Sequence, residues 1–301
     1  MATTKFDVIV IGTGIAGLAA ARHAAQRGLK VAGIEALLFG GLVININELD
    51  GELSGSGTDI ASNMMGEISE LGVENLSETV SALARDGDGI AVTTDGGTYR
   101  ARAVIVASGA KLKRLGVPGE AEFEYRGVSQ CADCDGPMYQ NEEVVVVGGG
   151  DSALQEALVL ANFCKRVHLV HRGAKFHARQ QLADAVAANA KIQPLWNTIV
   201  EAVLGEKMVN KVRARDAAGK VSEIPCAGFF AYVGLEPNCE FAPPEIKRDA
   251  RGALVTDAEL QTTMAGVFAA GAVRAGCGGM LSDALADGEK AAASAAKMLG
   301  C

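Results

Sequence analysis

The pattern of apolar and polar positions near the N-terminus predicts a dinucleotide-binding unit. A short apolar run at 6–11 ends in a glycine-rich turn, a helical stretch follows to about Gln26, and a second apolar run at 30–34 closes on an acid. Glycines permit a tight turn and a close approach of the backbone to pyrophosphate, and the acid can bind a ribose hydroxyl. The residues expected to contact the dinucleotide are Gly12, Gly14, Ala16, Gly17 and Glu35.

The same pattern recurs in the middle of the chain. The apolar run 144–147 precedes a second glycine turn, a helix is expected over 154–163, and another strand over 167–170. This strand ends in His171-Arg172 rather than in an acid, and a cation here favours the 2′-phosphate of NADP over the ribose of NAD. The expected contacts are Gly148, Gly150, Ser152, Ala153, His171 and Arg172.

Other segments complete the two units. Residues 103–109 and 266–273 have the pattern of a strand followed by a turn, and the alanine-rich segment 281–299 favours a helix. Pro118 with its neighbouring glycines and the double-proline segment 240–244 predict linkers.

These elements predict an α/β fold with two Rossmann-like three-layer dinucleotide-binding domains, the second inserted into the first. Residues 1–114 and 242–301 would form the first, discontinuous domain, and residues 115–241 the second, which carries the paired cysteines described below.

Composition narrows the functional classes. The chain has 301 residues, 49% of them apolar, and a formal net charge of −8 without a basic run, which argues against nucleic acid or an anionic membrane as the main partner. No apolar run is long enough to span a bilayer, and no secretory signal precedes the first strand, so a cytoplasmic protein is expected. Four histidines without paired spacing predict no metal site.

Two of the seven cysteines, Cys131 and Cys134, are separated by only two residues and precede the second glycine turn. Such a pair is typical of a redox-active disulfide, because a thiolate attacks disulfides and a nearby carboxyl group can shuttle its proton. The alternative, half of a zinc site, lacks a second cysteine or histidine pair. The other five cysteines are isolated, as expected for buried or inert thiols.

In this order, the motifs resemble those of the low-molecular-weight thioredoxin reductases. The resemblance covers nearly the whole chain and rests on Gly12-Thr-Gly-Ile-Ala-Gly17, Gly40-Gly41, Val106-Ala-Ser-Gly109, Cys131-Ala-Asp-Cys134-Asp135-Gly136, Gly148-Gly-Gly-Asp-Ser-Ala153, Phe230-Ala-Tyr-Val-Gly234-Leu-Glu-Pro237-Asn238 and Gly266-Val-Phe-Ala-Ala-Gly271.

The resemblance implies a homodimer with FAD in the split domain and NADPH in the inserted one. Electrons would pass from NADPH through FAD to the cysteine pair, and then to a thioredoxin-like protein or a small disulfide. Cys131 would be the exposed attacking thiol, Cys134 the one facing the flavin, and Asp135 the acid–base group. Further implied FAD contacts are Gly40, Gly41, Asn45, Ala107, Gly109, Gly271, Ala272 and Met280.

Several positions depart from the family pattern. Leu42, Ala272, Gly279 and Met280 replace polar residues that contact FAD in the family, and neighbours such as Asn45, Asn47 or Ser282 could compensate. At the NADP site, Arg172 is the one arginine that remains of three family cations, because Gly173 and His177 stand in place of the other two. Lys175 is nearby, but its ammonium group lacks the planar fork of a guanidinium. NADH is therefore an alternative donor.

The docking side also differs, because Pro137 and Met138 replace two aromatic residues and Asp133 adds a negative charge between the cysteines.

The main hypothesis is a disulfide reductase driven by a pyridine nucleotide. The alternatives are a flavin-dependent dithiol oxidase that uses oxygen, a reductase fed by a ferredoxin-type donor because its NADPH site has degenerated, and a redox-sensing protein without catalysis.

Overall fold

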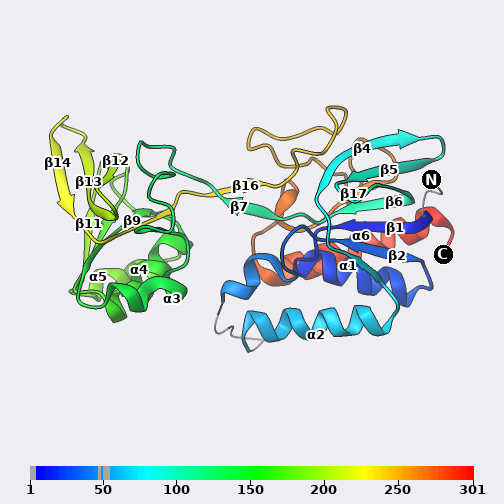
Figure 1. The fold of residues 1–301 in the computed structure, drawn as a ribbon, viewed down its shortest axis with the longest axis horizontal. Helices are drawn as coiled ribbons and strands as arrows, with labels where there is room; N and C mark the ends of the chain where they lie inside the picture. Colours follow the sequence, from blue (N-terminus) through cyan, green and yellow to red (C-terminus); the bar gives the residue numbers. More distant parts are fainter. Residues whose placement is uncertain (1–4, 47–48, 50–54) are drawn as a thin grey trace. The chain divides into compact units, whose positions relative to one another are not determined.

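The computed structural model describes residues 5–46, 49 and 55–301, and divides into two compact units. The first unit is formed by Met1–Lys111 and Glu236–Cys301, and the second by Leu112–Leu235, which is inserted into it (Figure 1). Each unit has its own parallel sheet next to helices, so the predicted fold class is confirmed. Asn47, one of the residues considered for FAD, lies outside the described residues.

The first unit is built on a seven-stranded sheet of order β3-β2-β1-β6-β5-β4, in which β17 also pairs with β6. Strands β3, β2, β1, β6 and β17 are parallel, whereas β4 and β5 form an antiparallel extension. The strands are β1 (Lys5–Ile11), β2 (Val31–Ile34), β3 (Glu74–Leu76), β4 (Val80–Asp86), β5 (Gly89–Thr94), β6 (Thr98–Val106) and β17 (Val267–Ala269).

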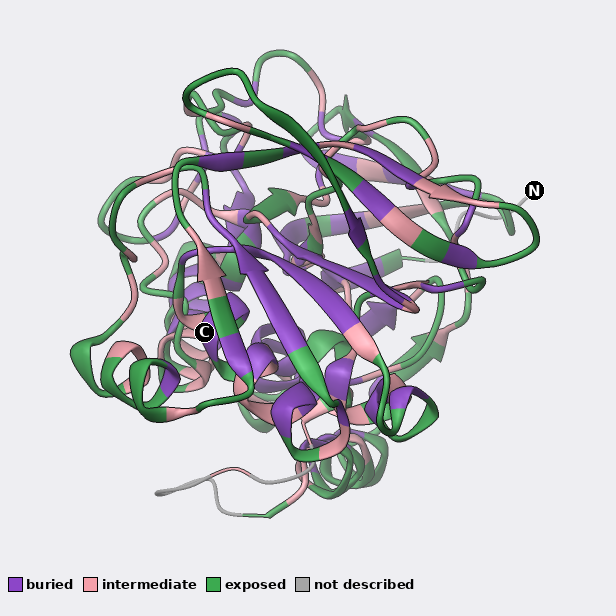
Figure 2. Ribbon diagram, turned by 90° about the vertical axis from the view of Figure 1, so that its left-hand side faces the viewer, coloured by how far each residue is buried: buried purple, intermediate pink, exposed green. Residues whose placement is uncertain are grey.

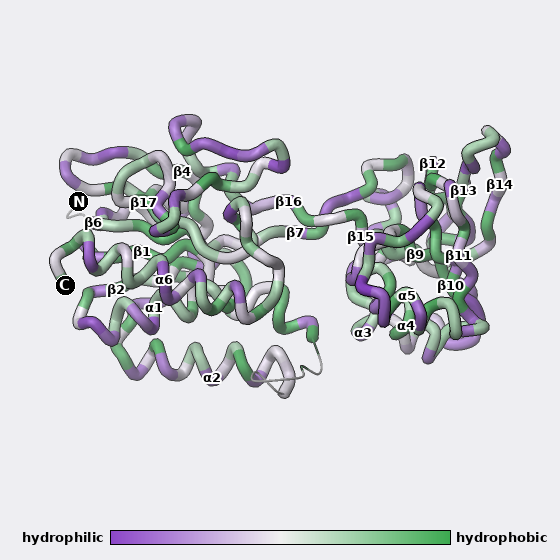
Figure 3. Tube along the Cα trace, turned by 180° about the vertical axis from the view of Figure 1, so that it is seen from behind, coloured by the Kyte–Doolittle hydropathy of each residue, from purple (hydrophilic) through white to green (hydrophobic). Residues whose placement is uncertain are grey.

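Alternating side chains of β1 serve two cores of this unit. Val8 and Val10 pack with α1 (Ile15–Gln26), α2 (Gly57–Glu70) and α6 (Leu281–Leu299), whereas Ile9 and Ile11 join a cluster with buried residues of the 239–264 segment. The central strands are strongly hydrophobic (Figure 3), as expected for a sheet that is covered on both faces. Two short 3-10 turns complete the unit, η1 (Gly41–Asn45) and η3 (Gly271–Val273).

The second unit has three layers. Its five-stranded parallel sheet has the order β11-β10-β9-β15-β8, with helices packed on one face and a three-stranded antiparallel sheet, β12-β13-β14, on the other. The central strands of this sheet are buried, as the burial colours of Figure 2 show. Its elements are β8 (Val128–Ser129), α3 (Ala132–Asp135), η2 (Gly136–Tyr139), β9 (Glu143–Gly148), α4 (Asp151–Phe163), β10 (Arg166–Val170), α5 (Gln180–Ala188), β11 (Ile192–Leu195), β12 (Thr198–Gly205), β13 (Val209–Asp216), β14 (Val221–Pro225) and β15 (Gly228–Tyr232).

The linkers lie elsewhere than the proline and glycine pattern predicts. The chain passes between the units at β7 (Ala110–Leu112) and β16 (Leu235–Pro237), which pair as a two-stranded sheet. Pro118 instead belongs to the second unit, where its carbonyl accepts a hydrogen bond from the Val203 amide, and Ala242 in the second expected linker is buried in the core of the first. Among the described residues, no helix combines the length and the apolar character that crossing a membrane requires.

Candidate active site

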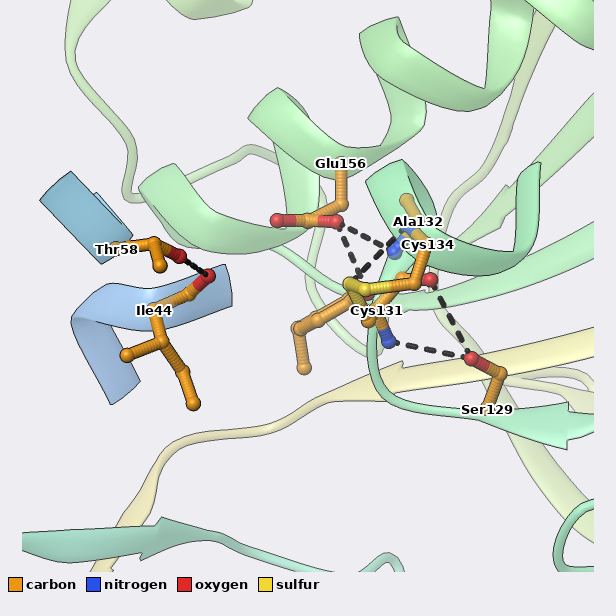
Figure 4. The surroundings of a disulfide bond; sticks show 8 residues. Ile44, Thr58, Ser129, Cys131, Ala132, Cys134 and Glu156 are labelled. Carbon is orange, nitrogen blue, oxygen red and sulfur yellow. Dashed lines mark hydrogen bonds between the residues drawn. A yellow bond between two sulfur atoms is a disulfide. The ribbon is translucent and has the colours of Figure 1, made fainter. Parts of the chain in front are cut away.

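The paired cysteines form a disulfide at the start of the short helix α3. Cys131 precedes the helix, and its sulfur accepts a hydrogen bond from the Cys134 amide at 3.2 Å. The Cys131 amide in turn donates to the Ser129 hydroxyl, also at 3.2 Å (Figure 4). The Cα atoms of the two cysteines are 5.3 Å apart. The two cysteines expected to form a redox pair are therefore joined as a disulfide, and hydrogen bonds of the local main chain fix its position.

The exposure of the two cysteines differs from the expectation. Cys134 is exposed, whereas Cys131, at the N-cap of α3, is half-buried. Asp135, the expected acid–base residue, is half-buried at the end of α3. Burial raises the pKa of Tyr139 to about 12, and the negative charge of Asp135 adds to this rise.

A half-buried carboxyl group that the sequence analysis missed lies against this helix. Glu156 of α4 accepts hydrogen bonds from the Ala132 amide at 3.0 Å and from the Tyr232 hydroxyl at 3.2 Å (Figure 4 shows the first). Burial raises the pKa of the Glu156 carboxyl above its usual value, although both hydrogen bonds oppose this shift. The signal was present in the sequence, because Glu156 interrupts an apolar stripe at helical spacing formed by Ala153, Ala157 and Leu160.

The second glycine turn opens onto a cavity of about 500 Å³. All of residues 148–153 line the cavity, together with Arg172 and His177. No side chain caps the start of α4 in the described part of the chain, so its first amides remain available to an anion. A Cβ atom on Gly150 would meet nothing within 4 Å and would project into open space. The turn, with the expected contacts Gly148, Gly150, Ser152 and Ala153 in one wall, therefore fits a dinucleotide phosphate.

Two of the four cations at or beside this cavity have acidic partners. Arg114 contacts Glu124 at 2.6 Å, and the Nε atom of Arg179 contacts Asp151 at 2.6 Å. Arg172 and Lys113 also line the cavity, and neither forms an ion pair with a described residue.

His171 lines the same cavity and also supports the glycine turn. Its ring is buried, and Nε2 donates to the Lys175 carbonyl at 2.9 Å. A Cβ atom on Gly149 would lie 2.3 Å from the ring, so the glycine turn rests directly on it. Burial lowers the pKa of His171. His171 therefore supports the turn as a neutral ring, and offers the phosphate no charge at neutral pH.

The first glycine turn has the corresponding geometry. Gly12 has φ +92°, and a Cβ atom there would lie 2.6 Å from the Ala107 carbonyl oxygen. A Cβ atom on Gly17 would lie 1.9 Å from the Gly12 oxygen, whereas one on Gly14 would come no closer than 3.7 Å to any neighbour. No side chain caps α1 within the described residues. Glu35 accepts from the Thr13 amide at 2.9 Å, which fixes the acid beside the turn, and the turn fits the ADP half of FAD.

The other expected FAD residues divide into two groups. Gly40 donates to the Thr13 carbonyl, and a Cβ atom on Gly271 would lie 2.9 Å from that of Ala16, so the structure brings these residues to the first turn. Ala107 also lies there, Gly41 follows Gly40, and Gly109 follows Ala107 by two residues. Asn45 ends η1, and Ala272 and Met280 are exposed, so no described contact ties these three to the turn.

A buried ion pair was also missed by the sequence analysis. Asp287 of α6 contacts Arg274 through two hydrogen bonds of 2.6 Å, and accepts from the Gly271 amide at 3.0 Å. The two charged side chains are only 15% and 10% exposed. The Gly271 segment, which lacks the polar residue usual at position 272, is therefore fixed from the side of α6.

Comparisons with known proteins agree with this geometry. The model of the family described as pyridine nucleotide-disulphide oxidoreductase matches residues 6–297. The thioredoxin reductase of Treponema pallidum is 38% identical and covers 98% of both chains. The crystal structure of Lactococcus lactis thioredoxin reductase in its FR conformation is 34% identical, has a TM-score of 0.93 and covers 98% of this chain and 99% of its own. Bacillithiol disulfide reductase from Bacillus cereus, at 22% identity and a TM-score of 0.83, shares the fold.

The match extends over nearly the whole chain and includes the disulfide and both glycine turns. Family membership implies FAD and a pyridine nucleotide, and it confirms the predicted flavoprotein disulfide oxidoreductase class. The chain belongs to the low-molecular-weight thioredoxin reductase family of pyridine nucleotide-disulphide oxidoreductases, and is a thioredoxin reductase-like enzyme.

Proposed function

We propose that this enzyme uses NADPH or NADH to reduce the disulfide of a thioredoxin-like protein. The observation that carries the proposal is the Cys131–Cys134 disulfide in the same compact unit as the cavity at the second glycine turn. A reduced cysteine pair passes its electrons to another disulfide by thiol–disulfide exchange, which suits a disulfide acceptor. The cavity disfavours an oxidase that has no use for a pyridine nucleotide.

Each cofactor has a place in this proposal. FAD belongs to the first unit at Gly12, Gly14 and Glu35, and the pyridine nucleotide to the second at Gly148, Gly150 and Arg172. Bound FAD would supply the two-electron relay between nicotinamide and disulfide. The chain's own groups do the rest: glycine-turn amides bind the phosphates, one cysteine attacks the acceptor as a thiolate, and Asp135 transfers the proton.

The chain would act as a homodimer in a reducing compartment such as the cytoplasm, as expected for its family. The replacement of two aromatic residues by Pro137 and Met138 favours an acceptor whose docking surface differs from that of an ordinary thioredoxin. A small disulfide is the second acceptor class to test.

Steady-state oxidation of NADPH and NADH, with and without a thioredoxin disulfide, tests the proposal. We expect nucleotide oxidation that depends on the acceptor, and a flavin absorbance that bleaches with the nucleotide under anaerobic conditions. Failure of both nucleotides to reduce the flavin would reject this donor and favour a ferredoxin-type one. Oxygen uptake with dithiothreitol, without disulfide reduction, would identify a dithiol oxidase.

A further inference from the structure

The Glu156 carboxyl group lies against the main chain of the redox helix. Its Oε2 atom is 3.0 Å from the amide of Ala132, the residue that directly follows Cys131. The same oxygen accepts the Tyr232 hydroxyl hydrogen bond at 3.2 Å, so the two donors fix the carboxyl group from α3 and from β15. Figure 4 shows that Glu156 reaches from α4 toward the end of α3 where the disulfide lies.

The surroundings of this carboxyl group contain acids but no balancing cation. Burial is the main cause of the raised pKa of Glu156, and the charge of Asp133 in α3 adds to it, while Asp135 stands at the end of the same helix next to Tyr139 of η2. No lysine or arginine forms an ion pair with Glu156 in the described part of the chain. A negative charge on Glu156 is therefore little compensated, and acts on the neighbouring sulfurs through a partly buried environment.

We propose that Glu156 is a positioning residue of the redox site, whose carboxylate keeps the Cys131 thiol protonated after the disulfide has been reduced. Reduction breaks the S–S bond and adds two electrons from the donor. When Glu156 is ionised, the reduced pair also takes up two protons, and both sulfurs become thiols. When the charge of Glu156 is absent, the pair takes up one proton more often, and one sulfur remains a thiolate. A protonated Cys131 is less open to alkylation and to stray oxidation.

This inference rests on the proposed function only in that the cysteine pair is redox-active. Its consequence has a distinct pH dependence. Below the pKa of Glu156 the carboxyl group is neutral and exerts no field, and well above the thiol pKa both cysteines are ionised in any variant. The effect of Glu156 on the thiolate population must therefore be largest between these two pKa values.

The test measures alkylation of the full-length protein after reduction with dithiothreitol and its removal. Iodoacetamide is the probe, and peptide mass spectrometry separates Cys131 from the other cysteines. In Glu156→Gln, which keeps a hydrogen-bond acceptor for Ala132, we expect Cys131 to be alkylated roughly threefold to tenfold faster than in the wild type near pH 7. The ratio should fall to about one at low pH and again at high pH.

Two further variants separate charge from structure. Glu206→Gln removes an exposed carboxylate of the same unit, and should leave the alkylation profile unchanged. Tyr232→Phe removes a hydrogen-bond donor that lowers the pKa of Glu156. In this variant, the change in the Cys131 alkylation rate that follows ionisation of Glu156 should therefore move to higher pH. Equal Cys131 profiles in the wild type and Glu156→Gln, or a rate ratio independent of pH, would overturn the proposal. Because alkylation requires neither NADPH nor an acceptor, this outcome is distinct from failure of the proposed function.

Discussion

His171 shows how a residue that matches a binding motif can also support the fold around the site. The sequence places it where a cation would attract the NADP phosphate, but the ring lies buried beneath Gly149 with its Nε2 hydrogen bonded to a carbonyl. Because the fold favours the neutral ring, the folded state binds fewer protons than the unfolded chain below pH 6.5, the ordinary pKa. The contribution of His171 to the free energy of unfolding is therefore fully present above pH 6.5, and it is lost as the pH falls through the lowered pKa of the folded state.

Trp196, the only tryptophan of the chain, reports on this ring. Its centroid is 6.1 Å from that of His171, and a protonated imidazole quenches indole fluorescence. We expect Trp196 emission to fall with a midpoint below pH 6.5, and His171→Gln to abolish the transition. His177→Gln is the control, because its exposed ring also contacts His171. If His177→Gln abolished the transition and His171→Gln did not, the titrating group would be His177 and the prediction would be wrong.

The cysteine pair gives the second residue-scale prediction. Cys131→Ser should abolish disulfide reduction but leave reduction of the flavin by the nucleotide intact, since hydride transfer precedes thiol exchange. Anaerobic flavin absorbance and acceptor turnover measure the two steps separately. Cys226→Ser removes a buried thiol of the same unit and should retain turnover. Full acceptor turnover by Cys131→Ser would show that another nucleophile carries the reaction.

Arg172 should determine what remains of the NADPH preference. A charge-assisted contact to the 2′-phosphate contributes about 1.5–3 kcal/mol, which corresponds to roughly a tenfold to hundredfold preference. Arg172→Gln should raise the KM for NADPH by about this factor and leave the KM for NADH nearly unchanged. Lys175→Gln, a control outside the cavity, should affect neither nucleotide. A thousandfold NADPH preference in the wild type would mean that other cations rebuild the phosphate site.

At the scale of elements, local sequence patterns determine most of what is observed. The strands flanking both glycine turns form where the apolar runs predict them, and the helix at 281–299 forms where the alanine-rich sequence favours it. The missed features depend on long-range contacts. Arg274 and Asp287 pair across 13 positions, and Glu156 meets Tyr232 across 76. The expected linker at Pro118 fails for the same reason, because its carbonyl is hydrogen bonded by Val203.

The contact between α1 and α6 gives a prediction at this scale. A Cβ atom on Gly288 would lie 2.1 Å from the Ala16 carbonyl oxygen, so the two helices approach each other at backbone distance. Gly288→Val should destabilise the first unit by about 1–3 kcal/mol or more, because rigid backbone has to move. Ala286→Val, on the exposed side of α6, is the matched control in chemical denaturation. Equal stability of the two variants would contradict the observed packing.

At the scale of the whole molecule, two units of the same design each present a glycine turn at an uncapped helix. Each has its own hydrophobic cores, so ligand binding in one unit should stabilise that unit by mass action without requiring the other. Gly14 and Gly150 are equivalent positions, where a Cβ atom would meet no described atom closer than 3.7 Å and φ is negative. A larger side chain at either position is compatible with the fold but projects into the expected ligand site.

Hydrogen exchange on the full chain can therefore assign the two cofactors. In the wild type, FAD should protect residues 12–17, and NADPH residues 148–153. Gly14→Val should abolish the first protection and retain the second, whereas Gly150→Val should do the reverse, since each added side chain fills the space that a pyrophosphate needs. Loss of both protections in one variant, with exchange in the absence of ligands unchanged, would show that the two sites are not independent. Protection of 148–153 by FAD would reverse the assignment, because the unit that carries the disulfide would then hold the flavin.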